Sequence, residues 1–249
     1  MWEGEAKESL DVQSPPNSFT AMVFNYADLN EAYQNGGPRM MVPKAFASGQ
    51  FTSNYHLVLN GVIGMIGIVF RPSALHNFFG VRMSQLVNSR MALELLIPEK
   101  KAELLWSKVK SGKTDEDRVA ILEDYVQSLL PIAKGRLSVI DEAVELMDNH
   151  KGSVSVEDVA SQLKISKRYM EKKFLEKVGV SPKFYARIKR FVSLSKEVAY
   201  NKNFDWQDIV FEYGFHDQSH LVKEFMEFNK MNPSDYHLKH NELIRFVKH

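Results

Sequence analysis

The side chains best suited to bind a charged partner are concentrated in one segment, residues 164–196. This segment holds eleven Lys and Arg residues but only two acids, Glu171 and Glu176, for a formal charge of +9. Residues 202–242 carry four basic and eight acidic residues, for −4, and the 249-residue chain totals only +1. A near-neutral total argues against a nucleic-acid partner, whereas a concentrated basic segment favours one. The alternative is a solvated helical face, as in most charge runs.

Enzyme chemistry finds little support in the sequence. The chain has no cysteine, which excludes disulfides, thiolate zinc sites and a catalytic thiol. His56 and His76 stand alone, without the paired histidine and following Glu that a metal-binding barrel needs. There is no Gly-x-Ser-x-Gly, no phosphate-binding glycine loop and no paired carboxylates in a strand context. We therefore expect no cofactor, no metal and no catalytic residue.

The C-terminal part contains an internal repeat. Ser155-x-x-Asp158 and, fifty residues later, Asp205-x-x-Asp208 each predict a helix start, followed by a turn and a second helix opening at Ser166 or Asp217. Each unit therefore reads as a helix-turn-helix, whose second helix can enter the major groove of DNA. The positions that match at an offset of 51 residues are Met170, Phe174, Pro182 and Tyr185 with Leu221, Phe225, Pro233 and Tyr236.

The apolar residues of each second helix define an inward face, and helical spacing then predicts the outward one. In the first unit the outward residues are Lys167, Arg168, Glu171 and Lys172, with Lys173 beside them. In the second unit they are Gln218, Ser219, Val222 and Lys223. A helix from Pro182 to about Tyr200 joins the units and adds Lys183, Arg187, Lys189 and Arg190.

The pattern from Asp205 to Tyr236 resembles the signature of AraC/XylS-type bacterial transcription regulators. The residues that carry it are Ile209, Gly214, Phe215, Asp217, Ser219, Leu221, Phe225, Pro233 and Tyr236. The resemblance covers about residues 137–237 and implies a seven-helix DNA-binding domain with two recognition helices in successive major-groove segments. It places Arg168, Glu171, Lys172, Ser219, Val222 and Lys223 at base-reading positions, flanked by Lys167 and Gln218.

The second unit departs from that family's pattern. Val210 replaces a small residue, Met226-Glu227 replaces basic residues, and Lys230 replaces a glycine. We expect Asn229 to take the left-handed conformation that ends the helix. Because the basic pair is missing, we predict that the first unit dominates DNA affinity. Phosphate contacts are assigned to Lys167, Lys173, Arg187 and Lys189, with Arg168 pairing with guanine and Glu171 with cytosine.

The N-terminal part reads as β-rich, with a loose arm over residues 1–17. We predict strands at 19–26, 39–42, 45–48, 55–59 and 61–70, with Asn60-Gly61 as a hairpin turn and residues 64–70 buried on both faces. Predicted helices cover 73–79, 84–96, 101–109 and a stretch opened by a Thr114–Asp117 capping box and ended by Pro131. The stretch Gly64 to Gly80 is weakly similar to the β-rich sensor domains of some AraC-type regulators.

Two interpretations stay open in this part. The aromatic residues either line a ligand pocket or form the barrel core; they are Phe19, Phe24, Tyr26, Phe46, Phe51, Tyr55 and Phe70. The stripe on the helix after Thr114 serves either intramolecular packing or dimerisation; it consists of Leu122, Tyr125, Val126 and Leu129.

Together these features predict an α+β protein with two domains. Residues 1–130 form a β-rich, barrel-like sensor or oligomerisation domain with following helices, and residues 131–249 an all-α domain of two helix-turn-helix units joined by a linker helix. The expected function is a cytoplasmic, sequence-specific transcription regulator or activator. Its expected partners are double-stranded operator DNA, RNA polymerase, a small-molecule effector at the N-terminal domain and a second copy of the chain, with no membrane. The alternatives are a small-barrel, metal-independent enzyme and a non-specific architectural DNA binder.

Overall fold

A computed structural model describes residues 1–34, 36–200, 205–233 and 236. The N-terminal part is a curled antiparallel sheet in the order β4-β3-β6-β2-β5-β7, with β1 also paired to β6. The strands are β1 (Trp2–Ser14), β2 (Thr20–Asn25), β3 (Glu31–Gln34), β4 (Met40–Met41), β5 (Ala45–Ser48), β6 (Tyr55–Phe70) and β7 (Arg90–Ala92). The long β6 is central, since it pairs with β1, β2 and β3. The predicted α+β class and barrel-like sheet are confirmed.

Two predictions about the sheet are wrong. Most of the expected loose arm is β1, whose Trp2, Ala6 and Leu10 pack on the apolar side of β6. The strand was not predicted because charged residues separate these apolar ones, so the sequence shows no clear apolar alternation. Asn60-Gly61 is not a turn, because β6 runs through it. Instead Gly61 takes a φ of +62°, and the register with β1 shifts between Ala6 and Leu10, as in a β-bulge.

The burial expected along the end of β6 holds only in part. Residues 63–66 of this strand are buried, whereas Val69 is 65% exposed. The end of the strand therefore leaves one face open to solvent.

The helices that follow the sheet correct two further predictions. Residues 84–96 do not form one helix, because Asn88 has a φ of +56° and Arg90–Ala92 pair with β5 as β7. Short 3-10 turns flank this strand, at Met83–Gln85 (η1) and Leu93–Leu95 (η2). Pro131 lies inside α3 and does not end it; the residue is exposed, so its ring lies on the solvent side. The α-helices are α1 (Ala74–Phe79), α2 (Glu99–Ser111) and α3 (Asp115–Lys134).

The starts of these helices agree better with the sequence. The Thr114–Asp117 capping box of α3 is present, and Gly80 ends α1 in the left-handed conformation. Ser73 precedes α1 but its hydroxyl makes no capping bond there; it donates to Asp141 instead, at 2.7 Å.

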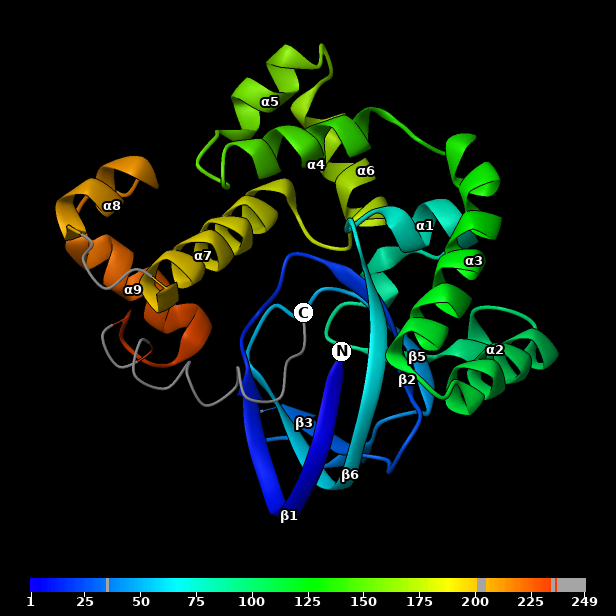
Figure 1. Cartoon of the computed structure of the whole chain (residues 1–249). Coiled ribbons are helices and arrows are strands. Elements are labelled where there is room, and N and C mark those ends of the chain that lie inside the picture. The colour runs from blue at the N-terminus through cyan, green and yellow to red at the C-terminus, as the bar shows by residue number, and fades with distance from the viewer. Residues whose placement is uncertain (35, 201–204, 234–235, 237–249) are drawn as a thin grey trace.

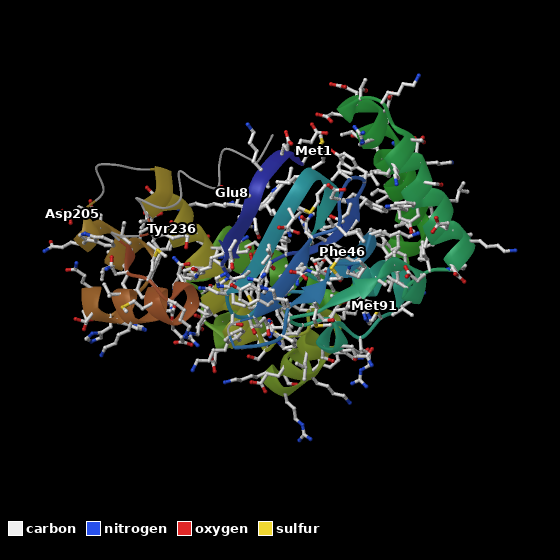
Figure 2. All side chains as sticks on the ribbon, turned by 90° about the horizontal axis from the view of Figure 1, so that it is seen from below. Met1, Glu8, Phe46, Met91, Asp205 and Tyr236 are labelled. Atoms are coloured by element: carbon white, nitrogen blue, oxygen red, sulfur yellow. The ribbon has the colours of Figure 1, made fainter. Side chains whose placement is uncertain are left out.

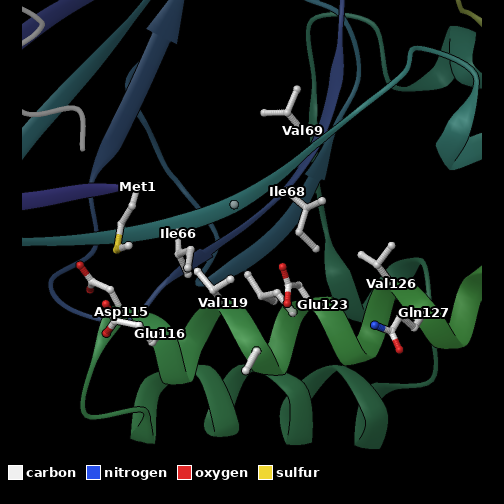
Figure 3. Close-up of a pocket in the computed structure, with 13 residues that line it drawn as sticks. Met1, Ile66, Ile68, Val69, Asp115, Glu116, Val119, Glu123, Val126 and Gln127 are labelled. Atoms are coloured by element: carbon white, nitrogen blue, oxygen red, sulfur yellow. The ribbon is translucent and has the colours of Figure 1, made fainter. Parts of the chain in front are cut away.

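The stripe on α3 packs within the chain. Leu122 belongs to the main core of the sheet domain and Tyr125 packs against that core. Val119 and Val126 line a groove of about 980 Å³ between α3 and β6, opposite Ile66 and Ile68 (Figure 3). The open choice between packing and dimerisation is therefore decided for Leu122 and Tyr125 in favour of packing.

Six described helices follow residue 138: α4 (Val139–Asn149), α5 (Val156–Gln162), α6 (Lys167–Lys177), α7 (Pro182–Tyr200), α8 (Trp206–Glu212) and α9 (Gln218–Asn229). Helices α4 to α6 lie over one end of the sheet domain, and α7 leads from them to α8 and α9 (Figure 1). Seen from below, the sheet lies between the second unit, marked by Asp205 and Tyr236, and helices α2 and α3 (Figure 2). The division of the chain at residue 131 stays a prediction.

Candidate nucleic-acid interface

The two second helices, α6 and α9, begin at the predicted caps. Ser166 Oγ accepts a hydrogen bond from the Tyr169 backbone N–H at 3.2 Å, and an Asp217 carboxylate oxygen accepts from that of His220 at 2.7 Å. Each cap satisfies an otherwise unpaired N–H of the first helical turn. The carboxylate of Asp217 has a lowered pKa, because backbone and His216 hydrogen bonds favour its charged form.

The inward faces of both helices are also as predicted. Met170 and Phe174 of α6 are fully buried in the core of the first unit, and Leu221 and Phe225 of α9 in that of the second. Each unit thus has its own apolar core, and the opposite side of its second helix faces away from it.

The first recognition helix, α6, presents unpaired cations. Arg168, Glu171 and Lys172 are exposed, and no described residue forms a side-chain hydrogen bond or ion pair with Arg168 or Lys172. Lys167 pairs with Glu157 of α5, and Lys173 Nζ lies 2.9 Å from a Glu176 oxygen. Each pair raises the pKa of its lysine, so Lys167 and Lys173 stay charged but are already compensated by a carboxylate.

The predicted phosphate contacts on α7 are engaged within the protein. Arg187 Nε lies 3.0 Å from Glu224 and its Nη2 2.6 Å from Glu227, while Lys189 Nζ lies 2.9 Å from Asp148. Burial opposes the charge of Arg187, but the hydrogen bonds that it donates to Glu227 and Glu224 outweigh this effect and raise its pKa.

A buried carboxylate that sequence reasoning missed joins α7 to α9. Glu224 is only 5% exposed and accepts hydrogen bonds from both Arg187 and Arg190, the latter at 2.7 and 2.9 Å. The Arg190 guanidinium also lies 4.4 Å from the centre of the Phe215 ring. No local sequence pattern predicts the contacts of Glu224 with the two arginines, since these residues lie 34 and 37 positions away from it.

The second recognition helix, α9, presents less charge. Gln218, Ser219 and Lys223 are exposed, whereas Val222 is half-buried against the core of its unit. The expected left-handed residue is wrong by one position: Lys230 has a φ of +60°, and Asn229 remains the last helical residue. Lys230 therefore replaces the family's glycine directly, in its strained conformation.

The sheet domain holds both recognition helices at equivalent positions. Gln50 Nε2 donates to the Val178 carbonyl at the end of α6, at 3.1 Å. Asn54 Nδ2 and Gln13 Nε2 donate to the Asn229 carbonyl at the end of α9, at 2.8 and 3.1 Å. Val178 and Asn229 are 51 residues apart, which is the offset of the repeat. These amides satisfy carbonyls that a helix end leaves without intrahelical partners.

Comparisons with known proteins divide the chain similarly. Residues 159–239 match the family model described as a helix-turn-helix domain, and residues 1–92 match that of a domain of unknown function. No curated protein matches the chain.

Solved structures resemble the chain at low identity. A transcriptional regulator with an AraC-type DNA-binding domain from Chromobacterium violaceum is 22% identical over 41% of this chain and 90% of that one, with a TM-score of 0.37. The C-terminal domain of AraT, a response regulator from Geobacillus stearothermophilus, is 17% identical over 45% and 89%, at 0.39. ToxT from Vibrio cholerae is 13% identical over 95% and 96%, at 0.45.

The repeated units and the family match identify the C-terminal part as a helix-turn-helix domain, a DNA-binding module typical of transcription regulators. This domain, at residues 159–239, overlaps the part of the sequence that resembles AraC/XylS-type regulators. Among the described helices, none has the length and apolar character needed to span a bilayer. The described residues also contain no cluster of three or more potential metal ligands.

Proposed function

We propose that the chain is a sequence-specific transcription regulator whose first helix-turn-helix unit supplies most of the DNA affinity. The observation that carries this proposal is the difference between the outer faces of α6 and α9. Arg168 and Lys172 are exposed and unpaired among the described residues, whereas α9 offers one cation, Lys223, on its outer face. Since phosphate neutralisation supplies much of protein–DNA affinity, the more cationic helix contributes more.

Base reading follows the chemistry of the exposed side chains. Arg168 suits a bidentate contact with guanine, and Glu171 accepts from the amino group of cytosine. Lys172 completes the set on α6. On α9, Ser219 and Lys223 read bases, and half-buried Val222 offers a smaller apolar contact.

Contacts with the phosphates of the DNA backbone position the protein on the duplex but do not specify the base sequence. Lys167, Lys173 and Gln218 flank the reading positions and supply these contacts. All four cations of this set pair with a carboxylate, but the side chains of Lys167 and Lys173 are 53% and 35% exposed, whereas those of Arg187 and Lys189 are only 27% and 24% exposed. Arg187 and Lys189 therefore receive the smaller share.

A regulator with two joined domains is also expected to have partners other than DNA. The sheet domain responds to a small-molecule effector. Its hydrogen bonds to the ends of α6 and α9 support this role, because a change in the sheet domain would act directly on both recognition helices. RNA polymerase and a second copy of the chain are further expected partners, and the cytoplasm, where bacterial DNA lies, is the expected location.

Selection from a library of genomic DNA fragments by electrophoretic mobility shift tests the proposal. We expect a subset of fragments to bind in the presence of excess competitor DNA. Binding with no preferred fragment would instead identify a non-specific architectural DNA binder, whose affinity depends on salt but not on sequence.

A further inference from the structure

The sheet domain contains a cavity whose lining combines apolar walls with one cation. Its volume is about 240 Å³, below the roughly 300–1,000 Å³ of most small-molecule pockets, so only a small ligand fits. Four of the seven aromatic residues singled out in the sequence line it, Phe19, Phe46, Phe51 and Tyr55, whereas Phe24 lies in the main core. The polar groups at the wall include Asn17, Ser48 and Arg90.

Arg90 is an unusual residue for such a wall. Its guanidinium carbon lies 4.6 Å from the ring centre of Phe51 and 4.5 Å from that of Tyr55. No carboxylate of the described residues forms an ion pair with it. Burial lowers the pKa of Arg90, against a smaller opposing effect of Tyr55, but a guanidinium stays protonated in proteins. Because Arg90 is half-buried and has no carboxylate partner among the described residues, an anion in the cavity would be stabilised beside it.

A polar atom without a partner lies in the same wall. The side-chain oxygen of Asn17 is buried and has no hydrogen-bond partner among the described residues. Buried polar atoms are nearly always paired, so this oxygen would favour a ligand that carries a hydrogen-bond donor besides its acidic group.

We propose that this cavity binds a small apolar carboxylate, with its anionic group on Arg90 and its hydrocarbon part against the aromatic walls. A planar carboxylate matches the two-pronged donor geometry of a guanidinium. This inference deepens the proposed effector response and rests on it for its consequence, although binding itself is independent of DNA.

One short segment connects the cavity with both recognition helices. In residues 50–55, Phe51 and Tyr55 line the cavity, while Gln50 and Asn54 hold the ends of α6 and α9. Asn88, two residues before Arg90, links this segment to Arg90. Its Oδ1 accepts a hydrogen bond from the Thr52 backbone N–H at 2.8 Å. A ligand that moves Phe51 or Tyr55 therefore shifts the amides that hold the two DNA-binding units.

Calorimetric titration of the full chain tests the site. The probes are butyrate, octanoate and phenylacetate, each compared with its neutral primary amide. We expect at least one acid to bind about tenfold or more tightly than its amide, as for a charge-assisted hydrogen bond. Arg90→Gln should remove this difference, whereas Arg82→Gln, at an exposed arginine outside the cavity, should keep it. The site is refuted if every acid and amide bind alike, or if Arg90→Gln binds the acid as tightly as the wild type.

Fluorescence anisotropy with the selected DNA tests the coupling. Saturating acid should change the DNA affinity of the wild type about fivefold or more. The Gln50→Ala/Asn54→Ala double variant should bind the acid but lose this response. An equal response in both proteins, or none in either, would overturn the coupling. The titration without DNA still decides the site if no fragment proves to be preferred, so the two proposals fail separately.

Discussion

At the scale of single residues, the basic segment is less available than its charge suggests. Lys167, Lys173, Arg187 and Lys189 all have carboxylate partners, and Lys177 Nζ donates to the Arg136 carbonyl at 2.9 Å. The +9 of residues 164–196 therefore divides into cations that hold the domain together and cations that face outward. Arg168 and Lys172 belong to the second group and carry the DNA-binding hypothesis.

Substitution of single lysines separates the contributions of the two recognition helices. Lys172→Ala should weaken binding to the selected DNA by about 1–3 kcal/mol, as loss of a base or phosphate contact does. Lys223→Ala should cost clearly less, because its helix lies in an acidic segment. Anisotropy titrations at several salt concentrations measure both. Equal losses would contradict dominance of the first unit, and Lys7→Ala in β1 serves as the control.

The buried carboxylate of Glu224 permits a matched stability test. Glu224→Gln leaves Arg190 without its anion in a buried place and should lower the free energy of unfolding by about 3–5 kcal/mol. Glu227→Gln removes an exposed partner of Arg187 and should cost at most about 1 kcal/mol. Urea unfolding followed by circular dichroism compares them, and similar midpoints would show that Glu224 does not hold α7 to α9.

At the scale of secondary-structure elements, local capping decides where the helices of the repeat begin. Ser155, Ser166, Asp205 and Asp217 each accept a hydrogen bond from a backbone N–H in the first turn of their helix. Asp141 also links two helices. It accepts hydrogen bonds from the Ser138 backbone at the start of α4, from Ser73 just before α1 and from Asn77 within α1, each within 2.8 Å. It thus links the sheet domain to the helix-turn-helix part.

The stability contributed by Asp141 should depend on pH. Burial raises its pKa, but the hydrogen bonds from Ser73, Ser138 and Asn77 outweigh this effect and lower it. The folded pKa is then below the unfolded value of about 4, so the stabilisation is present above that value and is lost as the pH falls through the lowered pKa.

We therefore expect Asp141→Asn to lower the free energy of unfolding at neutral pH by about 1–3 kcal/mol. The deficit relative to wild type should shrink as the pH falls below about 4. Urea unfolding across this range measures it, with exposed Asp124→Asn as the control. A deficit that does not change with pH would show that the charge of Asp141 contributes nothing.

At the scale of the whole molecule, the sheet domain and the helix-turn-helix units share a close interface. Gly179, just after α6, has a φ of +95°, and a Cβ atom there would lie 2.8 Å from the Met83 carbonyl oxygen of the sheet domain. Together with the amides of Gln50 and Asn54, this contact fixes both recognition helices relative to the sheet.

Gly179→Ala tests the contribution of this interface. The left-handed backbone alone costs an alanine about 1–2 kcal/mol, and the clash with Met83 should add to it. Gly214→Ala is the matched control, since its φ is +66° but its nearest neighbour, Ser153 Cβ, would lie at 3.6 Å. Thermal unfolding of the full chain should show the larger loss for Gly179→Ala. Equal losses of stability in the two variants would mean that the interface adjusts to the added methyl group without cost.

Short-range patterns predicted the helical repeat well and the sheet domain only in part, since they placed β2, β4, β5 and β6 but missed β1. Met170, Phe174, Leu221 and Phe225 are buried where the helical period put them, because a helix satisfies its own backbone and needs only one apolar stripe. The strand β1 was missed because its pairing partner β6 begins some forty residues later and no turn marks the pair. Sheet partners are chosen by tertiary packing, which overrides local propensity.

The sequence by itself determined the class of this protein: two helix-turn-helix units, their caps, their inward faces and the concentration of positive charge. These follow from residue spacings within one helix or between copies of one repeat. Only the tertiary structure decided which cations remain unpaired, that Glu224 joins α7 to α9, and that residues 50–55 contact both the Arg90 cavity and the recognition helices. The reason is physical, since these partners lie 34 to 175 residues apart and meet only when the chain folds.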